Sequence, residues 1–291
     1  FAGNELPEDS NSIAQAYAGH QFGHYNPNMG DGRAILLGEV IDANKRRRDI
    51  QLKGSGQTPF SRRGDGKSSL GPVLREYVIS EFMNSIGIPT TRALFALKTN
   101  ETVLRETDLP GGLLTRVAKS HIRIGTFEYA RSKSIETLKS LADYSINRHY
   151  PELNQTDNKY LGFFAAVCDK QASLISKWMG VGFIHGVMNT DNMTISGETI
   201  DYGPCAFIDR YDPKTVFSSI DHNGRYAYIN QPAILVWNLS KLAGTLVPLI
   251  DEKEEKSVKQ LTDVLQLVMP SYQEYFYKEF CEKLGLHNID A

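Results

Sequence analysis

The sequence predicts an α+β fold made of two lobes, a strand-rich first half and a mainly helical second half. Short apolar segments bounded by turn residues dominate the first half, and long segments of helical periodicity dominate from about residue 135. Polar stretches rich in glycine and charge lie near the join. We therefore expect residues 1–130 and residues 131–291 to form two lobes around a cleft.

Residues 1–30 are rich in Asn, Gly and His and are expected to form loops. The apolar run at 34–41 predicts a strand, and the segment at 49–53 predicts its antiparallel partner after a basic turn. The loop that follows, GSGQTPFSRRGDGKSS, combines glycine with several arginines. These segments predict a hairpin that ends at Lys53.

The segment after this loop is expected to be a helix, because its apolar residues fall at helical spacing. Those residues are Val73, Leu74, Tyr77, Val78 and Phe82. Glu76 lies on the same helix, and Gly87 and Pro89 end it. The runs at 91–98 and 112–118 predict two further strands.

The second half is expected to be mostly helical. Long helices are predicted at 135–150 and 160–179, and again at 232–250 and 257–284. One short apolar strand is predicted at 206–209, after a polar stretch. This order of elements is the reason for the two-lobe prediction.

The charge balance limits the partners that the chain can have. Its 291 residues include 32 Lys and Arg against 34 Asp and Glu, for a net charge of −2. Such a chain has no overall field to attract nucleic acid or an anionic membrane, so phosphate chemistry needs a local site.

No apolar run approaches the ~18 residues of a membrane span, and the chain begins without Met, as a piece of a longer protein would. Three scattered cysteines favour a reducing, intracellular compartment over a disulfide scaffold.

Two glycine-rich loops are candidate anion sites. In the first, Gly30, Gly32 and Arg33 precede a strand, where backbone N–H groups can approach phosphate oxygens; an ordinary turn is the alternative. The second ends in GDGKSS but is not a Walker A loop, because Ser61 stands where that motif needs glycine. Its charged residues, Asp65 among them, predict either an anion-facing loop or a solvated surface.

A lysine and a glutamate indicate a nucleotide site. Lys53 ends a predicted strand and Glu76 lies on the following helix, which is how kinases hold nucleotide phosphates. The lysine neutralises phosphate charge and the glutamate fixes its rotamer, although a surface ion pair is the alternative. Arg116 and Arg123 would clamp a terminal phosphate if they face the cleft, and would otherwise be solvated at the surface.

The polar stretch 185–203 carries the strongest signal. Asn192 and Asp201 are similar to the Asn and the Asp-Phe-Gly aspartate that hold magnesium in protein kinases. The stretch also follows the kinase pattern His-Gly-Asp-x-x-x-x-Asn, but Val187 occupies the place of the catalytic aspartate. Asp191 can reach the same space from the next turn of the loop, and a plain turn is the alternative.

Long motifs in this chain resemble those of the selenoprotein O family. They are YAGHQFGHYNPNMGDGRA (17–34), LKGSGQTPFSRRGDGKSSLGPVLREY (52–77), HGVMNTDNM (185–193), IDYGPCAFID (200–209) and NQPAILVWNLSKLA (230–243). The resemblance implies a two-lobed protein-kinase-like fold. It also implies transfer of AMP from ATP to protein hydroxyl groups, with the nucleotide flipped relative to ordinary kinases.

The resemblance further implies a role for each candidate residue. Lys53 and Glu76 match the family's ion pair, and Asp191 matches its proton acceptor. Asn192 and Asp201 match its metal ligands. The positions that match nucleotide contacts are Gly30, Gly32, Arg33, Lys53, Asp65, Gly66, Arg116 and Arg123.

The sequence therefore predicts a protein adenylyltransferase that uses ATP with Mg²⁺ or Mn²⁺ and modifies Ser, Thr or Tyr hydroxyls. Residues 1–130 would bind the nucleotide, and residues 131–291 would carry the catalytic and metal-binding loops. A phosphotransferase with Asp191 as base and an inactive nucleotide-binding module are the alternatives. UTP is a further candidate nucleotide, because no residue in these motifs reads the base. The family occurs in bacterial cytoplasm and in mitochondria, and the motifs do not indicate an oligomeric state.

Overall fold

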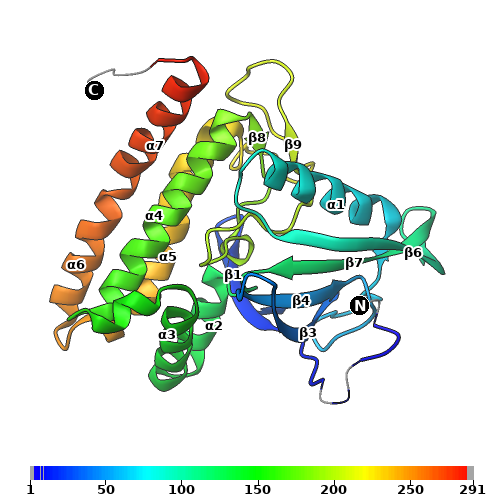
Figure 1. Cartoon of the computed structure of the whole chain (residues 1–291), viewed down its shortest axis with the longest axis horizontal. Coiled ribbons are helices and arrows are strands. Elements are labelled where there is room, and N and C mark those ends of the chain that lie inside the picture. Colours follow the sequence, from blue (N-terminus) through cyan, green and yellow to red (C-terminus); the bar gives the residue numbers. More distant parts are fainter. Residues whose placement is uncertain (1–2, 7, 9, 287–291) are drawn as a thin grey trace.

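The structure is a computed structural model that describes residues 3–6, 8 and 10–286 of the chain. It is a mixed α+β fold, as the sequence predicts. Most strands precede residue 119 and most helices follow residue 123, and the long helices lie to one side of the main sheet (Figure 1).

Five antiparallel strands form the main sheet. Strand β7 (Asp108–Ala118) pairs with β6 (Arg92–Leu104) on one side, and with β4 (Arg47–Lys53) and the short β5 (Ser68–Ser69) on the other. Strand β3 (Ala34–Ile41) pairs with β4, which confirms the predicted hairpin. Strands β6 and β7 are longer than predicted, because their far ends pair with each other as a second hairpin.

Helix α1 (Leu70–Ser85) confirms the predicted helix and packs on β6 and β7 (Figure 1). Of the apolar residues that predict the helix, three are exposed, namely Leu74, Val78 and Phe82. The buried positions include Glu76 and Met83. The helix turns the carboxylate of Glu76 inwards, where it meets Lys53, so a charged residue shares the buried face.

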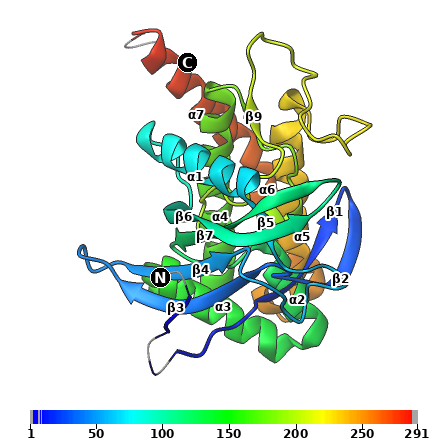
Figure 2. The same ribbon diagram turned by 90° about the vertical axis from the view of Figure 1, so that its right-hand side faces the viewer.

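A further hairpin lies outside the main sheet, where the sequence predicts loops. Its strands are β1 (Ala16–Gln21) and β2 (His24–Gly30), and it packs on helix α2 (Ile124–Lys133), which was not predicted either (Figure 2). The loop prediction was wrong because these strands are rich in Gly, His and Asn and lack an alternation of apolar residues. Gly125 permits the close contact, since a Cβ there would lie 2.2 Å from the carbonyl oxygen of Ala18.

Helices build most of the second half. Helices α3 (Ile135–His149), α4 (Lys159–Gly180) and α5 (Gln231–Ile250) lie close to their predicted positions. The predicted boundary between residues 130 and 131 falls within α2.

The predicted helix at 257–284 is in fact two helices. They are α6 (Glu254–Gln266) and α7 (Val268–Lys283), which meet at Leu267. Pro270 explains the break, because its nitrogen carries no hydrogen to continue the hydrogen-bond ladder of α6. In the first turn of α7 the same proline is tolerated.

Helices α4 and α5 contribute much of the hydrophobic core, including the fully buried Phe163, Phe164, Leu239 and Leu242. The segment Tyr228–Ile250 has a mean hydropathy of 1.6 and by length and composition alone could cross a membrane. Polar residues such as Asn238 and Lys241 interrupt this segment, so it is not an uninterrupted apolar run of the kind that the sequence was expected to lack. The buried apolar residues of α5 pack in the hydrophobic core of the protein.

Two short strands hold the polar stretch that carries the strongest sequence signal. They are β8 (Phe183–Ile184) and β9 (Ala206–Phe207), which pair with each other on the helical side. The predicted strand at 206–209 is therefore shorter than expected. Between them the chain forms a 3₁₀ turn at Thr190–Asn192.

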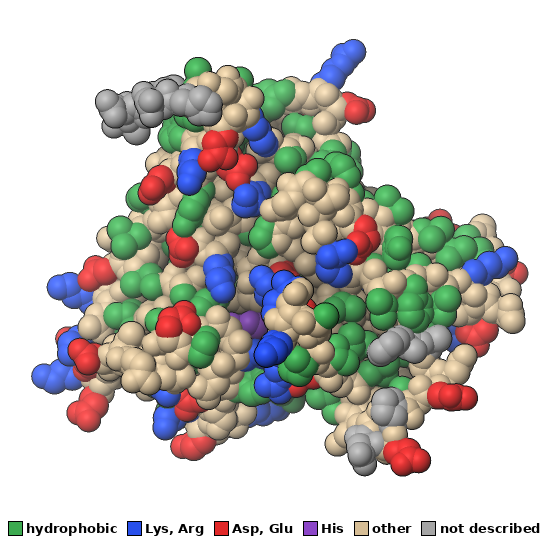
Figure 3. Space-filling model, in the orientation of Figure 1, with side chains coloured by type: hydrophobic (Ala, Val, Ile, Leu, Met, Phe, Trp, Pro, Cys, Tyr) green, Lys and Arg blue, Asp and Glu red, His purple; other side chains and the backbone are tan. Residues whose placement is uncertain are grey.

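The surface carries both signs of charge. On the face shown in Figure 3, basic and acidic side chains are interspersed over the helices and the sheet. Some of the surface charges are paired, as Arg92 is with Glu81. Such exposed pairs contribute only ~0–1 kcal/mol each, so the core remains the main source of stability.

The variants Met83→Ala and Val78→Ala test which face of α1 is buried. Met83 is fully buried and Val78 is 61% exposed. We expect Met83→Ala to lower the free energy of unfolding by about 2–5 kcal/mol, and Val78→Ala to change it by less than about 0.5 kcal/mol. Urea unfolding followed by circular dichroism measures both, and equal losses would contradict this assignment of the faces.

Candidate active site

A cavity of about 940 Å³ lies between the main sheet, α1 and the loops of the helical side. All the site residues singled out from the sequence line it: Gly30, Gly32, Arg33, Lys53, Asp65, Gly66, Glu76, Arg116, Arg123, Asp191, Asn192 and Asp201. Lys53 and Asp201, 148 positions apart in the chain, are in direct contact here. The fold thus brings the candidates together, while their chemical roles stay predictions.

Strand β4 explains why several polar side chains reach one region together. Its side chains alternate, so Asp49, Gln51 and Lys53 share one face and the apolar residues between them share the other. Lys53 Nζ lies 2.7 Å from Oε2 of Glu76, so the predicted ion pair is present. Burial would raise the pKa of Glu76, but Arg116 and Lys53 hold it below its ordinary value.

Asp201 is the point at which the charges of the cavity meet. Its Oδ1 accepts hydrogen bonds from Lys53 Nζ at 2.8 Å and from Arg116 Nη2 at 2.7 Å. Its Oδ2 accepts one from Arg123 Nη1 at 2.7 Å. Burial favours the neutral acid, yet these three cations hold the pKa of Asp201 well below its ordinary value. The backbone φ of 61° is in the left-handed region, which Asp tolerates better than most residues.

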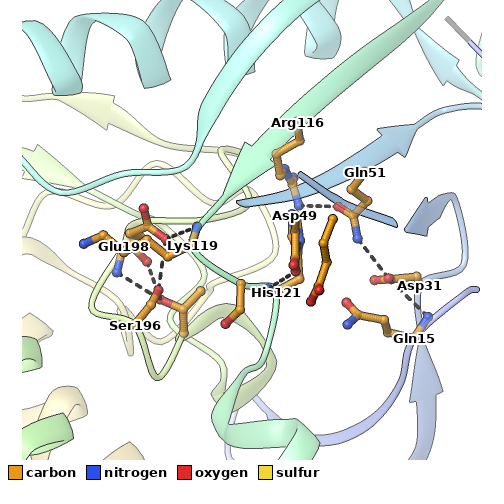
Figure 4. A network of polar contacts seen from close by, with 12 residues as sticks. Gln15, Asp31, Asp49, Gln51, Arg116, Lys119, His121, Ser196 and Glu198 are labelled. Atoms are coloured by element: carbon orange, nitrogen blue, oxygen red, sulfur yellow. Dashed lines mark hydrogen bonds and ion pairs between the residues drawn. The ribbon is translucent and has the colours of Figure 1, made fainter. Parts of the chain in front are cut away.

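Arg116 lies in a chain of buried polar contacts (Figure 4). Its side chain is 1% exposed and donates to Glu76 Oε1 from Nε at 2.8 Å and to Gln51 Oε1 from Nη1 at 3.1 Å. Gln51 lies opposite Arg116 in the β4–β7 pairing and donates to Asp31 Oδ2 at 3.0 Å. Sequence reasoning missed both partners: the alternation along β4 was an available signal for Gln51, whereas Asp31 is marked only by its place between two glycines.

Arg123, directly before α2, is equally buried and paired. Its Nη1 donates to the carbonyl oxygen of Asp191 at 2.8 Å, and its Nη2 lies 3.5 Å from Oδ1 of Asp31. The guanidinium also lies over the ring of Tyr17, 4.7 Å from the centroid. Neither Arg116 nor Arg123 is therefore a solvated surface residue.

Asp191 is a buried carboxyl group with an unsatisfied oxygen. Its Oδ1 is shielded from solvent and has no hydrogen-bond partner. Burial raises the pKa of Asp191 to about 7, against the opposing effect of Arg123. Gly19 makes room for this carboxyl group, because a Cβ at Gly19 would lie 2.6 Å from Oδ1. Near neutral pH the group can therefore both accept and release a proton, as a general base must.

Asn192 and Val187 belong to the same loop. The side-chain Nδ2 of Asn192 donates to the carbonyl oxygen of Val187 at 2.9 Å, which fixes the orientation of the amide. Val187 lines the cavity but has no proton acceptor in its side chain. His185 donates from Nε2 to the carbonyl oxygen of Ile200 at 2.8 Å and stacks on Trp178, so it anchors the loop rather than facing the cavity.

The first glycine-rich loop is packed against the second. A Cβ at Gly30 would lie 2.3 Å from the ring of Phe60, and a Cβ at Gly32 would lie 2.9 Å from the carbonyl oxygen of Phe60. Ser61 Oγ donates to the carbonyl oxygen of Gly32. Close packing therefore requires glycine at both positions. The backbone of this loop lies beside the cavity.

The second loop is tied down by a charged pair at the surface. Asp65 accepts from Arg105 Nη1 at 2.9 Å, and Gly66 has a φ of 66° that favours glycine. Arg33 is exposed beside this loop and, among the described residues, has no carboxylate partner. Its charge is therefore available to a ligand in the cavity.

A strand lysine paired with a helix glutamate, with an aspartate of a later loop at the same site, is the arrangement of the nucleotide sites of protein kinases. Lys53, Glu76 and Asp201 have this arrangement here. The site therefore places the chain in the kinase-like class.

Comparison with known proteins identifies the family. The profile of the family described as protein adenylyltransferase SelO matches residues 2–291, so the chain belongs to this family. It is 60% identical over 287 residues to a protein nucleotidyltransferase YdiU of Rhizobium rhizogenes. The proteins of the same name from Bacillus cereus and Maridesulfovibrio salexigens are 59% and 58% identical over the same length.

These matches cover 98% of this chain but only part of each relative. The chain spans 57% of the Rhizobium rhizogenes protein, 59% of the Bacillus cereus protein and 58% of the Maridesulfovibrio salexigens protein. Membership of the family implies a kinase-like fold, in agreement with the site. The activity of the whole relatives is a proposal for this chain.

The variant Asp191→Asn tests the energetic effect of burying this carboxyl group. Its folded pKa is about 7 and its unfolded pKa is about 3.9, so the folded state holds the proton more tightly. Ionisation therefore destabilises the native protein progressively as the pH rises from about 4 to about 7. Asn has no such ionisation, so we expect the variant to gain about 2–3 kcal/mol of stability relative to wild type between pH 5 and pH 8.

Urea unfolding at the two pH values, in metal-free buffer, measures this gain. Asp209→Asn changes an exposed carboxylate of the same half and is the matched control. A stability difference between Asp191→Asn and wild type that does not change with pH would contradict the raised pKa.

Proposed function

We propose that the cavity binds ATP and that the chain transfers the AMP group to Ser, Thr or Tyr hydroxyls of other proteins. The observation that carries this proposal is the carboxyl group of Asp191, which lies in the cavity with an unpartnered oxygen and a pKa near 7. Val187 occupies the position of the usual kinase base and is unable to accept a proton. The names protein adenylyltransferase and protein nucleotidyltransferase, which the family and the relatives carry, support the same reaction class.

We further propose the two-lobed arrangement of a kinase-like fold. The sheet and α1, within residues 1–130, would form the nucleotide-binding lobe. Residues 131–291 would form the helical lobe that carries the catalytic and metal-binding loops. The position of the cavity, lined from both halves of the chain, supports this division.

The cations of the cavity would stabilise the pyrophosphate that leaves. Negative charge grows on it as its bond to the α-phosphorus breaks, and Lys53, Arg116 and Arg123 lie close enough together to share that charge. Glu76 would keep Lys53 oriented. The remaining residues that we assign to nucleotide contacts are Gly30, Gly32, Arg33, Asp65 and Gly66.

Asp191 would accept the proton of the acceptor hydroxyl as the hydroxyl oxygen bonds to the α-phosphorus. A flipped nucleotide would present the α-phosphate to this carboxyl group, and the phosphates beyond it to Arg116 and Arg123. The bond from Arg123 to the backbone of Asp191 supports this placement, because it joins the proposed base to the phosphate-binding side.

Asn192 and Asp201 would hold Mg²⁺ or Mn²⁺ in this reaction. The residues present fit such an ion, because carboxylate and amide oxygens are the hard ligands that it prefers. No group of three or more His, Cys, Asp or Glu side chains in the described part of the chain could hold a metal ion. Two ligands suit a cation that would take its remaining ligands from the nucleotide phosphates. When bound, such a cation would neutralise phosphate charge.

An intracellular location is part of the proposal. All three cysteines are free, which suits a reducing compartment. The relatives described above come from bacteria, where this compartment would be the cytoplasm.

Labelled ATP distinguishes this function from its alternatives. ATP labelled at the α- or the γ-phosphate is supplied with Mg²⁺ or Mn²⁺, and label is followed into protein. We expect label from the α position alone. Label from the γ position alone would establish a phosphotransferase instead, and nucleotide binding without transfer would establish a binding module. α-Labelled UTP in parallel measures the preference for the base.

The variant Asp201→Ala tests the proposed metal ligand in the same assay. We expect transfer of the α label to fall by at least ~10²-fold, because the variant removes a metal ligand and the anion that holds three cations in place. Asp209→Ala, at an exposed position in the same half, should retain wild-type transfer. Undiminished transfer by Asp201→Ala would remove Asp201 from the mechanism.

A further inference from the structure

A cluster of cationic and aromatic side chains lies beside the cavity but does not line it. We call it the Arg225 cluster, and its members are His20, Arg225, Trp237 and Lys241. The guanidinium carbon of Arg225 and Nζ of Lys241 each lie 4.5 Å from the ring centroid of Trp237. The imidazole of His20 meets the same indole edge-on, with 5.3 Å between the centroids. One indole thus gathers two permanent cations and an imidazole, whose Nδ1 lies 2.5 Å from Oε1 of Glu128.

Two of the three guanidinium nitrogens of Arg225 lack hydrogen-bond partners. Its Nε and Nη2 are buried and make no hydrogen bond. The carboxylate of Asp221 is close in sequence, but it accepts from the backbone N–H groups of Arg225 and Tyr226, at 2.9 and 2.8 Å. Over the described ranges of the chain, neither Arg225 nor Lys241 forms an ion pair. Shielded donors without acceptors cost free energy, which a ligand with matching acceptors would recover.

The cluster is joined to the turn that carries Asp191. The backbone N–H of His20 donates to Oγ1 of Thr190, the residue before Asp191, at 2.7 Å. Asn189 Oδ1 accepts at 2.6 Å from the hydroxyl of Tyr226, the next residue after the clustered arginine. A group bound at the cluster would therefore sit close to the proposed base.

We propose that the Arg225 cluster binds a carboxylate side chain of the acceptor protein, beside the hydroxyl that receives the nucleotidyl group. This inference rests on the proposed function. Nε and Nη2 form an edge of the guanidinium whose two parallel donors a carboxylate can accept at once. Both nitrogens are shielded, so binding would require the Arg225 side chain to turn this edge towards the arriving carboxylate. Lys241 adds positive charge at the same place. The nucleotide is not the occupant, because the members of the cluster lie outside the cavity.

Peptide binding followed through Trp237 tests this proposal. The chain has two tryptophans, and Trp178 is only 2% exposed, so a change in emission on binding reports on Trp237. Two peptides share one serine and differ only in having Glu or Gln beside it. Without nucleotide, we expect the Glu peptide to bind at least tenfold more tightly than the Gln peptide. Equal affinity for the two peptides would overturn the proposal.

Variants of the cluster locate the binding. Arg225→Gln should abolish the preference for Glu, and Lys241→Gln, at a half-buried position on α5, should weaken it even if the first variant does not fold. Arg131→Gln, at an exposed arginine of α2 outside the cluster, is the matched control and should keep the preference. An unchanged preference for the Glu peptide in folded Arg225→Gln, or in Lys241→Gln, would overturn the assignment.

A transfer assay separates failure of this inference from failure of the proposed function. With α-labelled ATP, we expect Arg225→Gln to raise the KM for the Glu peptide about tenfold. Selective binding of the Glu peptide by a wild-type chain that transfers no label would refute the proposed function and support the cluster. Transfer at equal KM to both peptides would refute the cluster and support the function.

Discussion

The convergence of three cations on Asp201 is the interaction on which the site depends. Lys53 comes from β4, Arg116 from β7 and Arg123 from the start of α2, and each contacts this one carboxylate. Glu76 balances two of these charges from α1. Removing one member of such a buried group leaves the others uncompensated, which costs far more than the pairs contribute. The sheet, α1 and the helical side are thus held in register by charge as well as by packing.

The same site contains groups that work against stability. Asp191 keeps an unsatisfied oxygen in the interior, and Asp201 has a left-handed backbone conformation. Each feature has a price of roughly 1–3 kcal/mol when nothing compensates it. The hydrophobic core around α4 and α5 is large enough to support them. Buried carboxyl groups with a shifted pKa cluster at functional sites, which is the physical reason to propose Asp191 as the base.

Much of this architecture was predictable from the sequence. The features that were missed depend on polar or close backbone contacts, which hydrophobic periodicity does not detect. The β3–β4 hairpin was predicted from two apolar segments separated by a basic turn. The candidate site residues were found from polar motifs that core packing does not explain. The hairpin formed by β1 and β2 was missed because its strands pack through glycine and polar side chains, without an apolar stripe. On α1, Glu76 is buried because it pairs with Lys53, and hydrophobic periodicity alone does not indicate this burial. Asp31 was missed because its partners, Gln51 and Arg123, come together only in the folded chain.

The β1–β2 hairpin that sequence reasoning missed connects both parts of the proposed reaction. Gly19 lies against the carboxyl group of Asp191, and the next residue, His20, belongs to the Arg225 cluster. A displacement of this short segment would alter the environment of the base and the geometry of the cluster together. Packing on α2 through Gly125 limits such displacement. A hairpin held in this way would keep the proposed base and the proposed acceptor-protein contact at a fixed distance, so that a hydroxyl beside a carboxylate would be recognised without help from the nucleotide.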